Sequence, residues 1–335
     1  MNTNTVSVRL TKHASKTDVP VLLIFFARPE IFVKVFDQVK KARPSKLFLY
    51  QDGPRENNPG DAEKIRNCRN IAEAIDWECE VHKFYQSKNV GCDPSEFIAQ
   101  KWAFSMVDRC IVLEEDDVPA QSFFPFCAEL LERFKDDVRI NMICGMNHLG
   151  VSKENPHDYL FSVTGAIWGW ASWKRVIDTW DEHYSFLDDH YAMRLLANLP
   201  PKHHDLGSFI RTAIQHRRSG KAYYETIFGA SYLLNSRLNI VPTRNMISNI
   251  GIGADATHGS ASLDVLPAGI RRVFNMKTHE IEFPLNHPKY VIADTEHAEG
   301  VFRIMGRGHP LVCRYRALMG RALRFKKKIK ALFGL

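Results

Sequence analysis

The first 150 residues alternate apolar runs of strand length with segments of helical periodicity. Residues 19–26 (VPVLLIFF) carry no charge, as expected for a strand buried on both faces of a sheet. Pro29 then opens a helical pattern that Pro44 ends. The same alternation predicts further strands at 46–50, 77–85, 110–113 and 140–144, and helices at 61–75, 94–107 and 122–134. We therefore expect an α/β fold with a mostly parallel, Rossmann-like sheet and helices on both faces.

Composition places the chain among globular proteins. Its 335 residues, 45% hydrophobic and 25% charged, suffice for one large domain or two modest ones and exclude a disordered chain. The seven cysteines are scattered and form no C-x-x-C pair, which argues against zinc ribbons and thioredoxin-like redox sites. This usage indicates a reducing compartment.

The alternation of predicted strands and helices divides the chain into segments. This alternation weakens after about residue 150, where the predicted loops lengthen and aromatic residues cluster between Tyr159 and Trp180. We expect a polar N-terminal tail at 1–18, a main unit at 19–262 with halves at 19–150 and 151–262, an appended segment at 263–312, and a basic helix at 313–335.

The C-terminal segment holds most of the net charge of +7. Residues 314–330 contain eight basic residues and no acidic one, so the rest of the chain sums to about −1. Apolar residues recur there at helical spacing, which predicts a basic amphipathic helix for an anionic membrane surface. A helix docked on the domain and a disordered tail are the alternatives, and nucleic acid is not expected as a partner.

No secretory signal or apolar stretch of membrane-spanning length is evident in the sequence. The longest uncharged apolar stretch, residues 19–27, is far shorter than the roughly 20 residues of a membrane span. We expect a cytoplasmic protein, peripheral at the inner face of the cell membrane.

Four consecutive acids, Glu114 to Asp117, come directly after the strand predicted at 110–113. Carboxylates this close repel one another when buried, and hard cations such as Mg²⁺ or Mn²⁺ relieve the repulsion. Arg28 and Asp52 end two other predicted strands, and parallel sheets bind ligands at that edge. We therefore expect a metal site there. An acidic first turn of the helix near Ser122 is the alternative.

The segment VLEEDDVPAQSFFPFCAELLERF resembles the metal-binding region of bacterial nucleotide-diphospho-sugar transferases of the GT-A class. Such proteins come from surface-polysaccharide gene clusters, some are labelled haemolysin-like, and N-acetylglucosaminyltransferase I is more distantly similar. The resemblance extends in blocks over residues 19–262 and implies one catalytic unit, with a nucleotide-sugar-binding half at 19–150 and an acceptor half at 151–262. It implies a GT-A fold, an Mn²⁺ or Mg²⁺ cofactor and a nucleotide-sugar donor, with UDP the expected nucleotide.

The resemblance also implies roles within the acidic run. The ungapped register puts the family's E-x-D on Glu114, Glu115 and Asp116. It implies that Asp116 is the metal ligand, with Asp117 as the alternative, and that Glu115 lies near the sugar or ribose.

Other blocks supply the rest of the expected nucleotide-sugar site. FFARPE carries Arg28, LYQDGPR carries Asp52, and N-V-G-C carries Gly91 in a loop that resembles the one passing over the nucleotide. In this family, an acid at the position of Asp52 commonly accepts a hydrogen bond from the nucleobase. A turn residue before Gly53 is the alternative for Asp52.

Tryptophans at 168, 170 and 173 form a W-G-W-A pattern that the family shares. Indoles stack well on sugar faces, so we expect Trp170 to face the sugar. Packing in the core is the alternative for these rings.

A closing block runs from KAYYE to the D-A-T-H ending. The family's catalytic acid falls on Glu225, which suits a general base for the acceptor hydroxyl. Asp188 and Asp189 are weaker candidates for that role. His258 in the D-A-T-H ending is a candidate contact to the metal or diphosphate.

The sequence thus predicts an inverting, metal-dependent hexosyltransferase or N-acetylhexosaminyltransferase. Its acceptor would be a glycan or lipid-linked hydroxyl in lipopolysaccharide or capsule synthesis. A nucleotidyltransferase would need a Gly-rich basic loop where this chain has FFARPEIF. A non-catalytic membrane-active or glycan-binding protein on the same scaffold is the second alternative.

Overall fold

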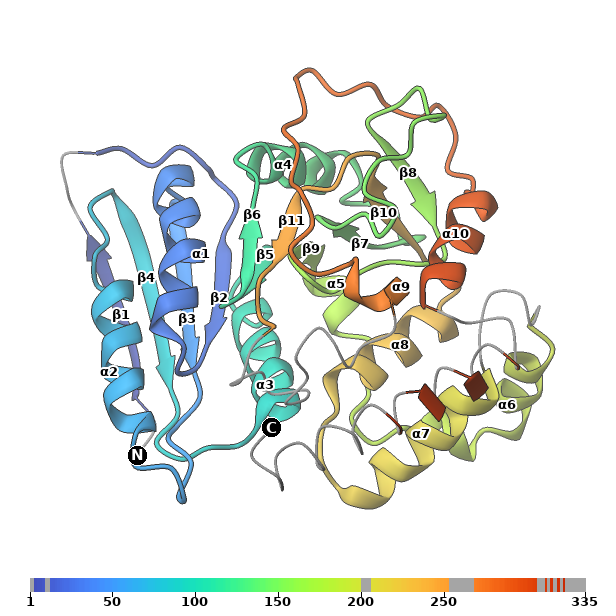
Figure 1. Cartoon of the computed structure of the whole chain (residues 1–335), viewed down its shortest axis with the longest axis horizontal. Helices are drawn as coiled ribbons and strands as arrows, with labels where there is room; N and C mark the ends of the chain where they lie inside the picture. Colours follow the sequence, from blue (N-terminus) through green and yellow to red (C-terminus); the bar gives the residue numbers. More distant parts are fainter. Residues whose placement is uncertain are drawn as a thin grey trace.

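The computed structural model describes residues 3–9, 13–199, 206–252 and 268–305, together with 311, 314, 315, 318, 319 and 322. Within them the chain is an α/β protein built on a nine-stranded mixed sheet in the order β1-β4-β3-β2-β5-β9-β7-β10-β8 (Figure 1). Strands β6 and β11 form a separate two-stranded ribbon.

The predicted alternation of strands and helices in the first 150 residues is confirmed. The elements are β2 (Val21–Phe25), α1 (Pro29–Ala42), β3 (Lys46–Gln51), α2 (Asp61–Ala72), β4 (Cys79–Tyr85), α3 (Cys92–Phe104), β5 (Arg109–Glu114), β6 (Asp117–Pro119), α4 (Phe123–Arg133) and β7 (Ile140–Cys144). Strands β4, β3, β2 and β5 are parallel neighbours.

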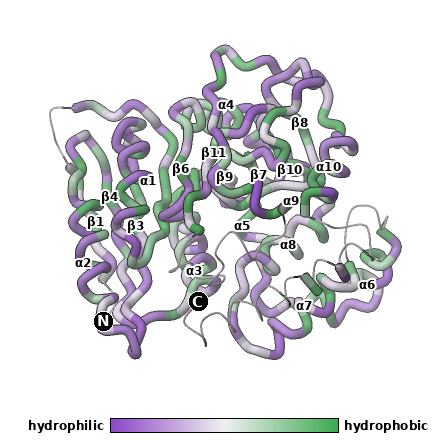
Figure 2. Tube along the Cα trace, viewed as in Figure 1, coloured by the Kyte–Doolittle hydropathy of each residue, from purple (hydrophilic) through white to green (hydrophobic). Residues whose placement is uncertain are grey.

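Strand β2 shows why the strands of the first 150 residues can be predicted from their apolar sequence. All its residues are buried, and alternate side chains enter two cores: Val21, Leu23 and Phe25 face one, and Leu22 and Ile24 the other. Helices α1 and α4 add residues to the first core and α3 to the second. In Figure 2, hydrophilic colour marks much of α1 and α2 outside the sheet.

The second half of the sheet is mixed, so the expectation of a mostly parallel sheet is wrong there. The further elements are β8 (Tyr159–Ser162), β9 (Trp170–Trp173), α5 (Lys174–Ile177), η1 (Ser185–Asp188), α6 (His190–Ala197), α7 (Leu206–Ser219), α8 (Tyr224–Leu234), β10 (Leu238–Pro242), β11 (Ile247–Asn249), α9 (Ala268–Arg271) and α10 (Thr295–Met305). Strand β9 lies antiparallel between β5 and β7, and β8 lies antiparallel at the edge beside β10.

Residues 3–9 form an edge strand of the sheet. Residues expected as a polar tail form β1 (Thr3–Arg9), which pairs antiparallel with β4 along its whole length. An edge strand leaves one side of its backbone unpaired and one face wet, so a polar sequence with isolated valines is compatible with it.

The segment expected as an appendage is fastened to the same core. Val273, Ile281 and Leu285 are buried in it, and the Asn275 amide donates to the carbonyl of Asn249 at 2.9 Å. The carboxylate of Glu280 accepts hydrogen bonds from the amides of residues 121 and 122, at the start of α4. Part of the segment expected at 263–312 therefore packs on the same core as the residues before it.

In the described residues, cysteines 68, 79, 110, 127 and 144 are buried and in the thiol form. No helix in that part of the chain is long and apolar enough to cross a membrane.

We predict that Glu280→Ala lowers the free energy of unfolding by about 1 kcal/mol, because two amides at the start of α4 lose their acceptor. Hydrogen bonds from Ser122 and Gln121 hold the pKa of Glu280 below its usual value of 4.5, outweighing the opposing effect of burial. A depressed pKa stabilises the fold above pH 4.5, and this contribution disappears as pH falls through the lower, folded-state value.

Urea unfolding at neutral pH and near pH 3 measures the effect, with Glu282→Ala at an exposed neighbouring site as the control. The difference between wild type and Glu280→Ala should shrink at the lower pH. Equal losses for the two variants at neutral pH would contradict the capping role.

Candidate functional site

The predicted acidic run spans the last residue of β5, the turn at Glu115 and Asp116, and the first residue of β6. Strand β5 runs parallel to β2, and β2 runs parallel to β3, so the carboxyl ends of all three meet at one edge of the sheet. Arg28 follows β2 and Asp52 follows β3. The structure therefore brings Arg28, Asp52 and the acidic run to the same edge, as the sequence predicted.

The guanidinium of Arg28 holds two of the four acids. Its Nε donates to Glu115 at 2.6 Å, and a terminal nitrogen donates to Asp116 at 2.8 Å. The other terminal nitrogen donates to the carbonyl of Gly251 at 3.1 Å. Burial alone would lower the pKa of Arg28, but the charges of Glu115 and Asp116 raise it in net. Arg28 is therefore the fixed counter-charge of this edge.

Glu115 is fully engaged by the chain. Its second carboxylate oxygen accepts the amide of Phe26 at 2.8 Å, so both oxygens have donors from the end of β2. Burial raises the pKa of Glu115, although Arg28 opposes the shift. Its contacts tie the acidic run to β2.

Asp117 is buried and hydrogen-bonded within the fold. It is 0% exposed and accepts hydrogen bonds from the amide of Gly169 at 2.8 Å and from the side chain of Asn249 at 3.1 Å. Burial and the neighbouring charge of Asp116 raise its pKa well above the usual value. A metal at Asp117 would have to displace these donors.

Asp116 keeps 8% of its surface exposed. Asn249 donates to one of its oxygens at 3.2 Å, and Arg28 donates to the other. A β-carbon at Gly251 would lie 1.7 Å from that second oxygen, so only glycine allows the chain to pass there. Of the two aspartates, Asp116 is therefore the one with surface left for a ligand.

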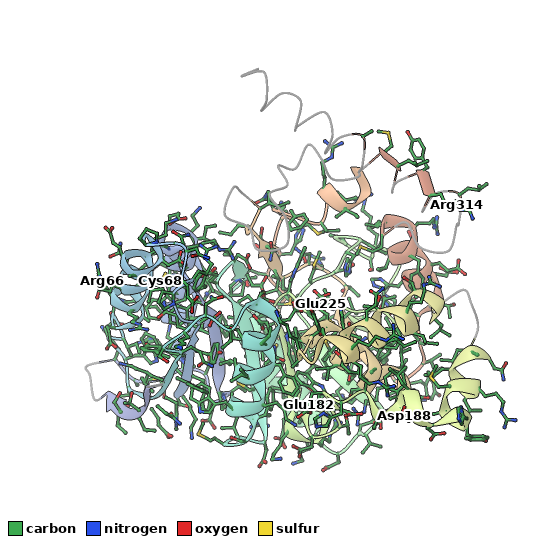
Figure 3. All side chains as sticks on the ribbon, turned by 90° about the horizontal axis from the view of Figure 1, so that it is seen from below. Arg66, Cys68, Glu182, Asp188, Glu225 and Arg314 are labelled. Carbon is green, nitrogen blue, oxygen red and sulfur yellow. The ribbon has the colours of Figure 1, made fainter. Side chains whose placement is uncertain are left out.

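Glu114 belongs to a wider group of acids. Burial raises its pKa well above the usual value, and the charges of Glu96, Asp117, Asp116 and Glu225 add to the shift. Glu225 is exposed in the first turn of α8 and appears in Figure 3. The structure thus brings the predicted base into the electrostatic neighbourhood of the acidic run.

Sequence reasoning missed Glu96. It lies on α3, is 6% exposed, and accepts a hydrogen bond from Gln100 at 3.0 Å. Burial raises its pKa to about 8, and the charges of Asp117 and Asp116 add to the shift. An acid within a helical pattern gives no sequence signal for this position, because only the packing of α3 beneath the site buries it.

Asp52 fastens the loop at residues 89–91. Its carboxylate accepts the amides of Gly53, Val90 and Gly91 at 2.8, 2.9 and 3.0 Å, and also the side chain of Asn89. Burial raises its pKa against the effect of these hydrogen bonds. The chain's own donors thus occupy Asp52, which favours the turn role over direct contact with a nucleobase. Gly91 directly precedes α3 with φ of 92°, a left-handed backbone conformation that favours glycine.

The tryptophan prediction needs correction. Trp170 is 1% exposed and packs against Phe228 in the second core, so its ring is not presented to a ligand. Trp173 is buried too, and its indole nitrogen donates to the carbonyl of Leu131. Trp168 is only partly buried, with its ring 4.9 Å from that of Phe274. It is the indole of this block with surface left for a sugar.

Asp189 caps α6, because its side chain accepts the amides of Tyr191 and Ala192. Asp188 forms an exposed ion pair with Arg217 and lies apart from Glu225 in Figure 3. These contacts explain both aspartates without a catalytic role. His258 lies outside the described residues.

A divalent cation at this edge would find few protein ligands. Among the residues that the structure describes, no three His, Cys, Asp or Glu side chains are grouped to hold a metal. Magnesium, however, uses one or two carboxylates together with substrate phosphates and water. Asp116 therefore fits as the protein ligand of such an ion.

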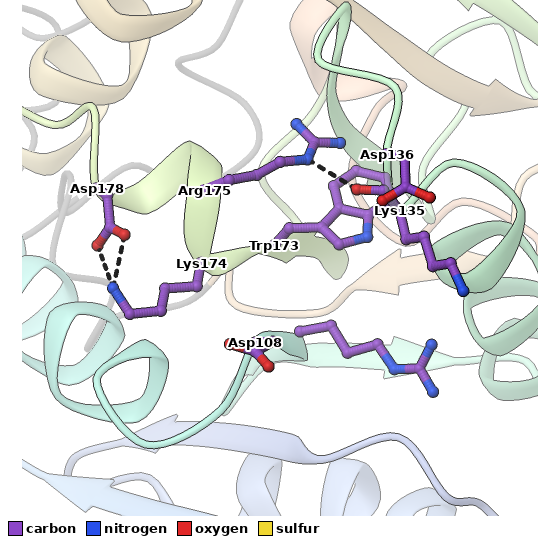
Figure 4. A pocket seen from close by; sticks show the side chains of 8 residues that line it. Asp108, Lys135, Asp136, Trp173, Lys174, Arg175 and Asp178 are labelled. Carbon is purple, nitrogen blue, oxygen red and sulfur yellow. Dashed lines mark hydrogen bonds and ion pairs between the residues drawn. The ribbon is translucent and has the colours of Figure 1, made fainter.

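A surface pocket of about 640 Å³ lies elsewhere (Figure 4). Arg109 at the start of β5 and Trp173 at the end of β9 line it, so it is at the opposite edge of the sheet from the acidic run. Its charges serve the fold: Lys174 pairs with Asp178, and Arg175 donates to main-chain carbonyls. The chemistry therefore concentrates at the acidic edge.

We predict that Arg28→Gln lowers the free energy of unfolding by about 3 kcal/mol, because Glu115 and Asp116 lose their buried counter-charge. The deficit should shrink as pH falls through the raised pKa of Glu115, since its protonated carboxyl no longer needs the guanidinium. Urea unfolding with EDTA present measures it.

Arg139→Gln is the matched control, because Arg139 pairs with Asp137 at the exposed surface. Its loss should stay below about 1 kcal/mol. Similar losses for the two arginines would contradict the role given to Arg28.

In comparisons with known proteins, no protein-family model matches this chain. No curated protein matches it either.

Proposed function

We propose that this chain is a metal-dependent glycosyltransferase with a GT-A fold, which transfers a sugar from a nucleotide-diphospho-sugar to a hydroxyl group. One observation carries the proposal. The acidic run and Arg28 come from distant parts of the chain and meet at the carboxyl edge of the parallel strands, and the charge of Glu225 acts on Glu114 there. That edge is where α/β sheets bind nucleotides and sugars.

Asp116 is the proposed metal ligand on the donor side. A bound Mn²⁺ or Mg²⁺ would neutralise charge on the departing diphosphate. Arg28 and Asn249 hold the Asp116 carboxylate in one orientation, so little reorganisation is needed when a ligand binds. Asp52 orients the loop at 89–91, and this loop then bounds the nucleotide side of the site.

Glu225 is the proposed base on the acceptor side. It takes the proton of the acceptor hydroxyl while that oxygen bonds to the anomeric carbon and the bond to the diphosphate breaks. Attack from the face opposite the leaving group inverts the anomeric configuration. Its exposed position at the start of α8 supports access by a bulky acceptor. Trp168 is the proposed aromatic surface for a sugar ring.

We predict that UDP or another nucleotide diphosphate binds only with Mn²⁺ or Mg²⁺, and that Asp116→Asn weakens this binding at least about tenfold, because an amide cannot supply the anionic ligand that the ion needs. Isothermal titration of UDP, GDP, CMP and their sugar conjugates, with and without metal, measures it. Asp189→Asn, at the cap of α6, serves as the control and should bind like wild type.

Failure of every nucleotide to bind under both conditions would contradict the proposal. It would favour the non-catalytic glycan-binding alternative.

We further predict that Glu225→Gln keeps nucleotide binding but slows transfer to the acceptor by about 10²- to 10⁴-fold, because the amide cannot accept the proton. Release of nucleoside diphosphate in the presence of acceptor glycans measures the rate. Glu182→Gln, at another exposed glutamate, is the control. A variant that loses binding and transfer equally would assign Glu225 to the donor site instead.

A further inference from the structure

A helical segment beyond α10 exposes large apolar side chains. Helix α10 itself is packed, with Val301 and Ile304 buried. After it, the described residues 311, 314, 315, 318, 319 and 322 are helical. Leu311 is 79% exposed, Tyr315 64% and Leu318 63%. Figure 3 labels Arg314 at the outside of the molecule in the same segment.

The exposed apolar residues share one face. Steps of four, three and four residues join positions 311, 315, 318 and 322, which is the spacing of a single stripe along a helix. Met319 lies beside this stripe and is also exposed. A contiguous apolar stripe open to water is a typical binding surface.

The charge of the sequence that carries the stripe indicates what binds there. Residues 314–330 carry eight basic and no acidic residues, whereas the rest of the chain is close to neutral. Two copies of such a segment repel each other, which disfavours a dimer through this face. A nucleic acid would neutralise the charge but leave the stripe in water. An anionic lipid surface accepts both the basic side chains and the apolar ones.

We propose that the exposed apolar stripe of Leu311, Tyr315 and Leu318 docks the protein on a membrane surface rich in anionic lipids. These side chains enter the boundary between headgroups and acyl chains, and the anionic headgroups attract the positive charge that the sequence carries after residue 313. Tyrosine suits this depth because its ring is apolar and its hydroxyl stays hydrated. The inference needs no catalytic activity, so its outcome is independent of the proposed transferase function.

Co-sedimentation of the full-length protein with vesicles tests this proposal. We expect binding to vesicles of phosphatidylcholine mixed with phosphatidylglycerol, little binding to pure phosphatidylcholine, and release at high salt. The double variant Leu311→Gln with Leu318→Gln keeps every charge and should bind about tenfold more weakly, because it removes apolar area from the stripe.

The matched control replaces two exposed apolar residues elsewhere, Val138→Gln with Ile292→Gln, which are 67% and 69% exposed. It should bind like wild type, and circular dichroism melting checks that both double variants fold. Equal binding to neutral and anionic vesicles would overturn the proposal, as would equal binding by the two double variants. Binding to polyuridylate together with none to vesicles would overturn it in favour of nucleic acid.

Discussion

The bridge from Arg28 to Glu115 and Asp116 is the interaction on which the acidic edge depends. Four carboxylates follow one buried strand, and their mutual repulsion in a poorly solvated position would cost the fold heavily. Arg28 neutralises two of them, while Asn249 and the amide of Gly169 hold the aspartates. The arrangement joins segments more than 200 residues apart, so the site forms only in the complete fold.

The first half of the fold is predictable because its strands are buried on both faces. Such strands appear in the sequence as apolar runs, as residues 21–25 show, and prolines 29 and 44 mark the start of α1 and the stretch just after its end. The second half is not predictable in this way. Strand β9 runs antiparallel between two strands that are distant in sequence, and nothing in its four residues specifies these neighbours. Strand β1 escaped notice because an edge strand needs little apolar sequence.

The position of the candidate site could be predicted from the sequence, but the roles of its individual side chains were harder to predict. The sequence places Arg28, Asp52 and the acidic run at the ends of predicted strands. Because the carboxyl ends of parallel strands lie at the same edge of a sheet, these residues could be expected together. Roles depend on which hydrogen bonds are already made, and these come from loops that sequence reasoning does not place. Thus Asp117 and Asp52 are held by main-chain amides, Trp170 is buried, and Glu96 enters from α3. Trp168 and Asp116 keep the exposed surface that a ligand needs.

The most direct test of the metal site is electron paramagnetic resonance of Mn²⁺ titrated with the protein, in the presence and absence of UDP. The account predicts that the signal of the free ion falls when protein and nucleotide are both present, and that Asp116→Asn restores it. A free-ion signal unchanged by wild-type protein and every nucleotide diphosphate tested would contradict the central claim, and the acidic run would then be a structural feature held by Arg28.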